Sequence, residues 1–207
     1  MNKDYLTAYR ACSNDEERSY VNNRWWNTSH EIIIRSMMHQ NDIPNLVRNS
    51  RLIWRKNVRH FFEMLEHSRI PLVIFSAGVT DIIDEAIRQL LGYRPDNITT
   101  AANVMSFDQS GFVSGFTDPP LHSLCKNVAR LEELVPDATK KFAQRSNVVV
   151  IGDTDSDARM VDDWQEKRML KIGLEAQEQR PLKLYDVVIK DPDCSRLTAI
   201  VQFMLST

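Results

Sequence analysis

The chain has 207 residues, 43% of them hydrophobic and 26% charged, which is ordinary for a globular protein with one large domain or a core and a small cap. A net charge of −2 gives no electrostatic basis for binding polymeric nucleic acid or an anionic membrane surface. The apolar runs are too short to cross a bilayer, the polar start predicts no signal peptide, and three scattered cysteines favour a reducing compartment. We therefore predict a cytoplasmic protein.

The first third of the chain has a helical pattern. Ser13 and Glu16 fit a capping box, which predicts a helix that runs to about residue 39. Pro44 marks a second helix start, and residues 54–67 repeat apolar side chains at helical spacing. We predict that residues 1–68 form a helical cap region.

From residue 69 onward, short apolar runs alternate with helical patterns. The run at 71–76, broken at Ala77 and Gly78, and the run at 147–151 are typical of buried parallel strands. Further elements are predicted as follows: a hairpin at 97–116, strands at 169–172 and 185–189, and helices at 81–91, 121–134, 155–163 and 193–205. The alternation predicts an α/β fold, with a Rossmann-like parallel-sheet core over residues 69–207.

Ligands of such sheets bind at the carboxyl ends of strands, and two of these ends are distinctive. The first is Ser76-Ala77-Gly78, where a hydroxyl group and the amides of a following helix could bind a phosphate group. The alternative is an ordinary strand-to-helix turn with a serine cap.

The second strand end carries three aspartates in five positions, within the segment GDTDSD at residues 152–157. Crowded carboxylates suit a hard cation such as Mg²⁺; the alternative is a solvated acidic turn. Lys126 lies between the two strand ends in sequence, and taken alone it is an ordinary surface lysine. A serine, a lysine and an acidic strand end, in this order, predict phosphoryl-transfer chemistry.

These motifs resemble those of the haloacid-dehalogenase superfamily of phosphatases. More closely, the chain is similar to the cytosolic 5′-nucleotidase III (pyrimidine 5′-nucleotidase) family from about residue 20 to the C-terminus. The segments that carry this resemblance are IFSAGVTDIIDEAIRQ (74–89), FDQSGFVSGF (107–116), LKIG (170–173) and YDVVIK (185–190).

The resemblance implies roles for individual residues. Ser76, Ala77, Gly78 and Lys126 would bind phosphate, Asp153 and Asp157 would belong to the Mg²⁺ site, and Asn127 could assist. Asp157 would alternatively orient Lys126 or support the ligands of the metal. The implied substrate is a nucleoside 5′-monophosphate, with pyrimidines favoured, and the full-length form would be a monomer.

Trp26 and His30 resemble the cap segment that contacts the base. They are four residues apart, so on a helix they share one face and could stack on a nucleobase. The alternative is that one tryptophan packs into the cap and His30 is merely exposed. Trp25 points elsewhere and is predicted to be a core residue.

The family's first motif, Asp-x-Asp-x-Thr after a buried strand, does not occur in these 207 residues. Its two aspartates are the nucleophile and the general acid, so we predict no catalytic residue in this chain and little turnover. The fold would lack its first central strand, as in an N-terminally truncated member of the family. The alternatives are a non-catalytic module that binds nucleotide or a partner, and a phosphatase for another small phosphate ester.

Overall fold

The computed structural model describes residues 2–164, 166–175 and 183–206, which form two compact units. Unit 1 comprises Met1–Ser50, Phe75–Ala86 and Thr100–Cys125. Unit 2 comprises Arg51–Ile74, Ile87–Thr99 and Lys126–Thr207. The predicted division into a cap at 1–68 and a core at 69–207 stays a prediction.

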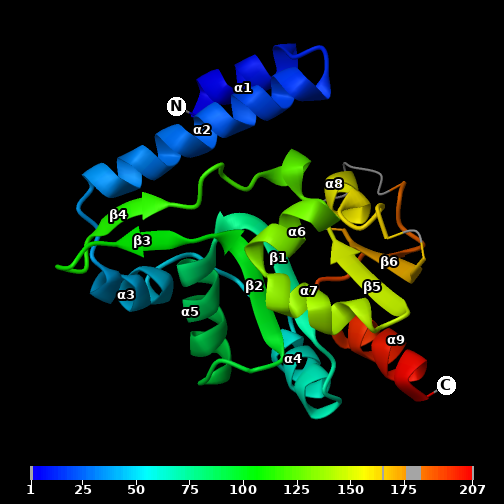
Figure 1. The fold of residues 1–207 in the computed structure, drawn as a ribbon. Helices are drawn as coiled ribbons and strands as arrows, with labels where there is room; N and C mark the ends of the chain where they lie inside the picture. Colours follow the sequence, from blue (N-terminus) through cyan, green and yellow to red (C-terminus); the bar gives the residue numbers. More distant parts are fainter. Residues whose placement is uncertain (1, 165, 176–182, 207) are drawn as a thin grey trace. The chain divides into compact units, whose positions relative to one another are not determined.

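Unit 1 begins with two helices, α1 (Asn2–Ala11) and α2 (Asp15–Arg35), which pack against each other as a hairpin (Figure 1). A 3₁₀ turn, η1 (Gln40–Asp42), leads into α3 (Ile43–Arg48). The strands β3 (Met105–Phe107) and β4 (Val113–Phe116) pair in antiparallel fashion, and α2 packs on β4. A second 3₁₀ turn, η2 (Ser123–Cys125), ends the unit.

Polar side chains occupy much of the interior of unit 1. Asn103 and His122 are almost completely buried, and Asn22 and His30 of α2 are also buried. Buried polar groups need hydrogen-bond partners. Asn103 donates to carbonyl groups of Ala77, Gly78 and Leu121, so its side chain joins segments that are distant in the chain.

Strand β1 (Leu72–Val79) and strand β2 (Ile98–Asn103) form a two-stranded sheet, connected by helix α5 (Thr80–Leu91). Each of these three elements has one end in unit 1 and the other end in unit 2. At the start of the pair, the Asn97 side chain donates to the Ile70 carbonyl over 2.8 Å, and Leu72 N–H donates to the Asn97 carbonyl over 2.8 Å.

Unit 2 contains a three-stranded parallel sheet in the order β5-β6-β7. Its register pairs Val150 with Lys171 and Ile172 with Val187. The strands are β5 (Asn147–Gly152), β6 (Arg168–Leu174) and β7 (Val187–Ile189). The helices of the unit are α4 (Val58–His67), α6 (Val128–Leu134), α7 (Pro136–Ala143), α8 (Asp155–Arg159) and α9 (Ser195–Ser206).

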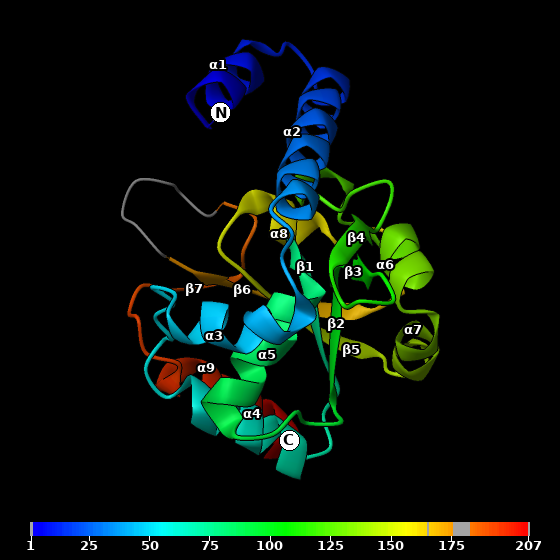
Figure 2. The same ribbon diagram turned by 90° about the vertical axis from the view of Figure 1, so that its left-hand side faces the viewer.

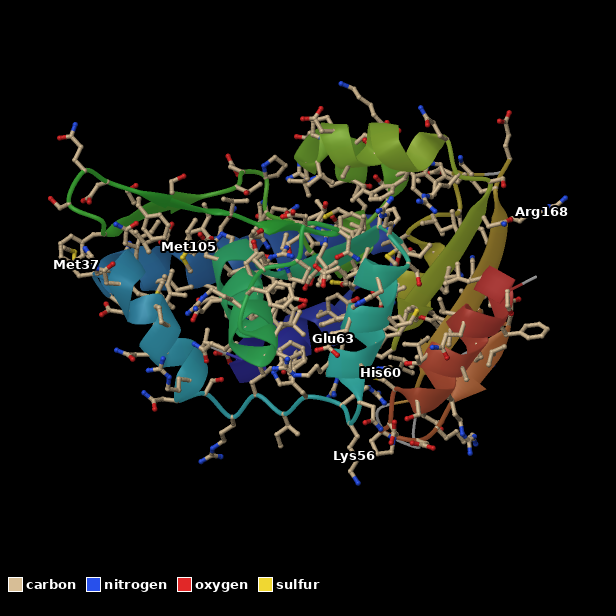
Figure 3. All side chains as sticks on the ribbon, turned by 90° about the horizontal axis from the view of Figure 1, so that it is seen from below. Met37, Lys56, His60, Glu63, Met105 and Arg168 are labelled. Atoms are coloured by element: carbon tan, nitrogen blue, oxygen red, sulfur yellow. The ribbon has the colours of Figure 1, made fainter. Side chains whose placement is uncertain are left out.

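Helices cover both faces of this sheet: α6 and α7 lie on one side and α9 on the other (Figure 2). Val150 and Ile172 are buried in the sheet, and Leu65 of α4 and Leu197 of α9 are buried where these two helices pack together. Exposed charged side chains at the edge of the unit, such as Lys56 and Arg168, point outward (Figure 3). The predicted α/β class with a parallel sheet is confirmed.

Most of the predicted elements are present, with shifted ends. The strand predicted to end at Ser76 continues to Val79, so the predicted break at Ala77-Gly78 is wrong. The predicted capping box is displaced by one residue: Asn14 caps α2, and Glu17 accepts from the Ser13 amide. The helix predicted at 54–67 begins only at Val58, and the one predicted at 121–134 is two short helices separated at Lys126-Asn127.

The first central strand of the fold is predicted from the sequence to be absent. Among the residues that the structure describes, β1 pairs only with β2, and β5 pairs only with β6. Each therefore keeps one edge without a partner strand in this part of the chain. No helix in the described ranges is long and apolar enough to cross a membrane.

Candidate active site

The acidic segment after β5 is held by a reciprocal cap at the start of α8. Thr154 is the N-cap residue, and its hydroxyl donates to Asp157 Oδ2 over 2.7 Å. The same carboxylate oxygen accepts from the amides of Asp153, at 3.3 Å, and Thr154, at 3.2 Å. The segment follows the carboxyl end of β5, where ligands of parallel sheets bind.

Lys126 forms an ion pair with the other carboxylate oxygen, Oδ1, of Asp157. The side chains are only 9% and 12% exposed, so this is a buried pair. Burial by itself raises the pKa of Asp157, but the hydrogen bond and the charge of Lys126, together with the Thr154 hydroxyl and the Asp153 amide, outweigh it and lower the pKa below its usual value. Asp157 is therefore an anion that fixes the position of the Lys126 ammonium group.

The pKa of Asp153 is shifted in the opposite direction to that of Asp157. Desolvation of its carboxyl group and then the nearby charge of Asp157 raise its pKa, and Lys126 only partly offsets them. Asp153 as a whole is exposed, so solvent and ions can still reach it. A cation beside Asp153 would remove this charge repulsion.

The donor set fits a Mg²⁺ ion that keeps most of its own water. Mg²⁺ sites often use one or two carboxylates with water and substrate phosphate, and Asp153 can supply one. Both oxygens of Asp157 already accept hydrogen bonds, which favours its orienting role over direct metal ligation. Within the described ranges, no three His, Cys, Asp or Glu side chains form a group that could hold a metal alone.

Tyr185 supports the acidic segment from the neighbouring part of unit 2. Its hydroxyl donates to the Thr154 carbonyl over 2.6 Å, which ties the N-cap residue of α8 to the segment before β7. Burial and the charges of Asp157, Asp153 and Asp155 raise the pKa of Tyr185, so the phenol keeps its proton and remains a donor at neutral pH.

Replacing Tyr185 by phenylalanine should lower the free energy of unfolding by about 1 kcal/mol, because the Thr154 carbonyl loses its donor while the ring stays. Urea unfolding would measure the change. Tyr20→Phe is the control, because Tyr20 is 63% exposed and should change stability little. Equal effects of the two substitutions would contradict a supporting role for Tyr185.

Ser76, Ala77 and Gly78 lie in unit 1 at the end of β1, whereas Lys126, Asp153 and Asp157 lie together in unit 2. The Gly78 amide donates to Ser76 Oγ over 3.0 Å. This bond uses an acceptor site of Ser76 and leaves the hydroxyl hydrogen able to donate to an anion. The segment is thus compatible with phosphate binding, although β1 runs through it.

Trp26 and His30 do share one face of α2, with ring centroids 5.7 Å apart. The His30 ring, however, is stacked on Phe116 of β4, with centroids 4.0 Å apart and planes 7° apart. His30 is only 5% exposed, so it is not the exposed residue of the alternative interpretation. Its Nε2 is covered by protein atoms and has no hydrogen-bond partner among the described residues. Burial lowers the pKa of His30, so the imidazole is neutral at neutral pH.

Three residues that contact the candidate site residues were not predicted from the sequence: Thr154, Tyr185 and Phe116. Crowded carboxylates in a sequence indicate that hydrogen-bond donors are needed nearby, but they do not indicate which residues provide these donors. Asn127, predicted to assist at the phosphate, caps α6 through an Oδ1 that accepts from the Arg130 amide over 2.8 Å. Trp25, predicted as core, is half-buried and lies against Tyr5 of α1, with ring centroids 5.1 Å apart.

Comparisons with known proteins show what the whole chain is similar to. A putative cytosolic 5′-nucleotidase 3 of Caenorhabditis elegans is 32% identical over all of this chain and 57% of its own length. A 7-methylguanosine phosphate-specific 5′-nucleotidase of Gallus gallus is 31% identical over 98% of this chain and 73% of its own length. The chain thus spans little more than half of the nematode relative.

Among solved structures, cytosolic 5′-nucleotidase IIIB bound to cytidine superposes with a TM-score of 0.71 at 20% identity, covering 99% of this chain and 72% of that one. This confirms the expected phosphatase-type fold. The family model for pyrimidine 5′-nucleotidase (UMPH-1) matches residues 6–205. The chain therefore belongs to the pyrimidine 5′-nucleotidase (UMPH-1) family.

Proposed function

We propose that this chain carries the phosphate- and metal-binding side of a 5′-nucleotidase, which hydrolyses a nucleoside 5′-monophosphate to nucleoside and phosphate. The proposal depends on the buried ion pair of Lys126 and Asp157 and on the nearby carboxyl group of Asp153. The pKa of Asp153 is raised. A fixed ammonium group and a crowded carboxylate together suit a phosphate dianion with a divalent cation. Family membership supports the same reaction.

Lys126 would act on the phosphate as a fixed positive charge. Asp157 holds its ammonium group, so little reorganisation is needed when charge develops on the phosphate oxygens. Ser76 would donate its hydroxyl hydrogen to a phosphate oxygen, with the Ala77-Gly78 backbone shaping the segment. Each of these groups is proposed to contribute to phosphate binding.

Asp153 is the residue that we propose as the Mg²⁺ ligand of this chain, with Asp157 supporting it through the hydrogen-bonded segment 153–157. When bound, Mg²⁺ would neutralise charge on the phosphate and polarise its oxygen atoms. The raised pKa of Asp153 supports this role, because a cation stabilises the ionised carboxylate that burial and Asp157 disfavour.

Turnover needs a nucleophile and a general acid, and we propose that these 207 residues hold neither group. Ser76 Oγ accepts a hydrogen bond from the Gly78 amide, and among the described residues no basic side chain is hydrogen-bonded to its hydroxyl group. The purified chain is therefore expected to bind nucleotide and release little phosphate. The alternative is a non-catalytic module, which would bind nucleotide or a partner as its whole function.

The proposed substrate is a nucleoside monophosphate, with pyrimidines favoured, in the cytoplasm, and the proposed full-length form is a monomer. The ligands and names of the compared proteins, cytidine and 7-methylguanosine phosphate, support a nucleoside. Trp26 and His30 would contact the base. Because Phe116 covers one face of His30 and protein atoms cover its Nε2, contact with a base would require the His30 side chain to move.

Mg²⁺ should stabilise the wild-type chain against thermal unfolding, and Asp153→Asn should abolish this stabilisation. An ion present at ten times its Kd adds about 1.4 kcal/mol to the free energy of unfolding. Differential scanning fluorimetry with Mg²⁺ and with EDTA would measure the shift. Asp155→Asn is the matched control, because it removes an exposed carboxylate two residues away. A shift retained in Asp153→Asn would exclude Asp153 as the ligand.

Activity is tested separately, by phosphate release from UMP, CMP, 7-methyl-GMP and AMP with Mg²⁺ or EDTA. Binding of UMP without release would support the proposed division of roles. Robust Mg²⁺-dependent release would show that another residue supplies the nucleophile. Absence of both UMP and phosphate binding in the folded chain would overturn the proposed function.

A further inference from the structure

Asn103, the last residue of β2, is completely buried in unit 1. Its Nδ2 amide group lies 2.9 Å from the Ala77 carbonyl oxygen, 3.0 Å from that of Gly78 and 3.0 Å from that of Leu121. Its Oδ1 accepts from the Leu121 amide over 2.7 Å. Two N–H bonds thus serve three carbonyl oxygens, and one N–H is shared.

These contacts fix the orientation of two successive peptide groups. In an extended strand, consecutive carbonyl groups point in opposite directions, but those of Ala77 and Gly78 both reach the same side-chain nitrogen. A trans peptide is planar, with its N–H opposite its C=O. The N–H groups of Gly78 and Val79 must therefore point away from Asn103.

A separate hydrogen bond shows the direction of one of these N–H groups. Gly78 N–H points to Ser76 Oγ, 3.0 Å away, on the side opposite to Asn103. Successive N–H groups that face the same side form a concavity suited to an anion. The side chain of Asn103 thus contacts segment 76–78 on the side opposite to the one that is proposed to bind phosphate.

We propose that Asn103 is a positioning residue for anion binding by Ser76-Ala77-Gly78. It holds the two peptides so that both N–H groups face away from Asn103. The Gly78 N–H then fixes the Ser76 oxygen, and the Ser76 hydroxyl hydrogen and the Val79 N–H are the donors for the ligand. Asn103 does not itself touch the phosphate. This inference rests on the proposed function of the segment and adds the group that keeps it in the binding orientation.

The test is sulfate binding to the purified 207-residue chain by isothermal titration calorimetry, because sulfate stays a dianion across the pH range of the measurement. Asn103→Asp keeps the size of the side chain and the acceptor for Leu121, but it cannot serve the three carbonyl groups: an ionised carboxylate donates no hydrogen bond and a protonated one donates a single bond. Sulfate affinity should fall roughly tenfold or more, as expected for losing one well-aligned hydrogen bond to a charged ligand. Affinity should partly recover as the pH falls, because a protonated carboxyl group can donate one bond.

Asn97→Asp is the matched control at the other end of the same two strands. There the side-chain amide donates to Ile70, far along β1 from Ser76. This variant should lose stability but keep wild-type sulfate affinity, without the pH-dependent recovery. Equal affinities of the two variants would overturn the positioning role and leave the proposed function standing, whereas no sulfate binding by wild-type protein would remove both.

A second measurement does not depend on the variant folding. Amide hydrogen exchange of the wild-type chain should be slow at Gly78, because its N–H is held on Ser76 Oγ by the Asn103-bound peptide. Exchange at Gly78 as fast as at the exposed turn residue Gln109 would contradict the inference.

Discussion

Replacing Lys126 by methionine is expected to lower the free energy of unfolding by about 3–5 kcal/mol at neutral pH. Methionine keeps most of the length of the side chain and removes its charge. Asp157 would then be a buried carboxylate without its cation, although Thr154 and the Asp153 amide would still donate to it. Urea unfolding followed by circular dichroism would measure the loss.

Lys171→Met is the control for this experiment. The Lys171 ammonium group also pairs with a carboxylate, Asp162 at 2.7 Å, but these side chains are 19% and 52% exposed. Removing an exposed pair should cost about 0–1 kcal/mol. A second change, Asp157→Asn in the Lys126→Met background, should recover much of the loss, because it removes the unpaired charge. A Lys126→Met protein as stable as Lys171→Met would show that the pair does not determine stability.

The same substitution should reverse a pH dependence. In the wild type the folded-state pKa of Asp157 lies below its unfolded value of about 3.9, so its contribution is present above that pH and is lost as the pH falls through the folded-state pKa. Without Lys126, burial becomes the dominant cause and favours the neutral acid. Stability of Lys126→Met should then increase, relative to wild type, as the pH is lowered toward the raised pKa.

The sequence predicted β5 and its acidic end well, because their signals are local. The apolar run 147–151 matches β5 to within one residue, and Gly111 marks the turn of the β3–β4 hairpin. Likewise, Lys126 and Asp157 could be proposed from motif order, and the structure places them in one ion pair.

What the sequence did not predict depends on contacts between distant segments. The predicted helix 121–134 is broken because Asn127 caps a new helix, and α7 was missed although Pro136 occupies its first turn. His30 is buried by Phe116, which lies 86 positions away in the chain, so α2 alone could not reveal its environment. Asn103 ends a strand and carries no motif; its position becomes meaningful only when Gly78 and Leu121 fold around it.

Gly152 is the second position where we expect a large effect, because it has no room for a side chain. A Cβ there would overlap Asp157 Cβ and would lie 2.6 Å from the Tyr185 hydroxyl oxygen and 3.0 Å from Asp157 Cγ. The Tyr185 ring can move, but Asp157 is held by Lys126 and by the cap of α8. Gly152→Ala should therefore cost about 3 kcal/mol of unfolding free energy, at the upper end of the usual range for overpacking.

The matched control is Gly115→Ala in β4, where a Cβ would meet Ser106 Cβ at 3.7 Å, an ordinary contact. Alanine is slightly better than glycine in a strand, so this variant should be neutral or slightly more stable. Gly152→Ala should also weaken Mg²⁺-dependent stabilisation, because any shift of Asp157 disturbs the hydrogen bonds that shape the Asp153 backbone. Similar unfolding free energies and Mg²⁺ responses for the two variants would mean that the acidic segment adapts to a side chain at Gly152, and that its close packing on Asp157 does not matter for the site.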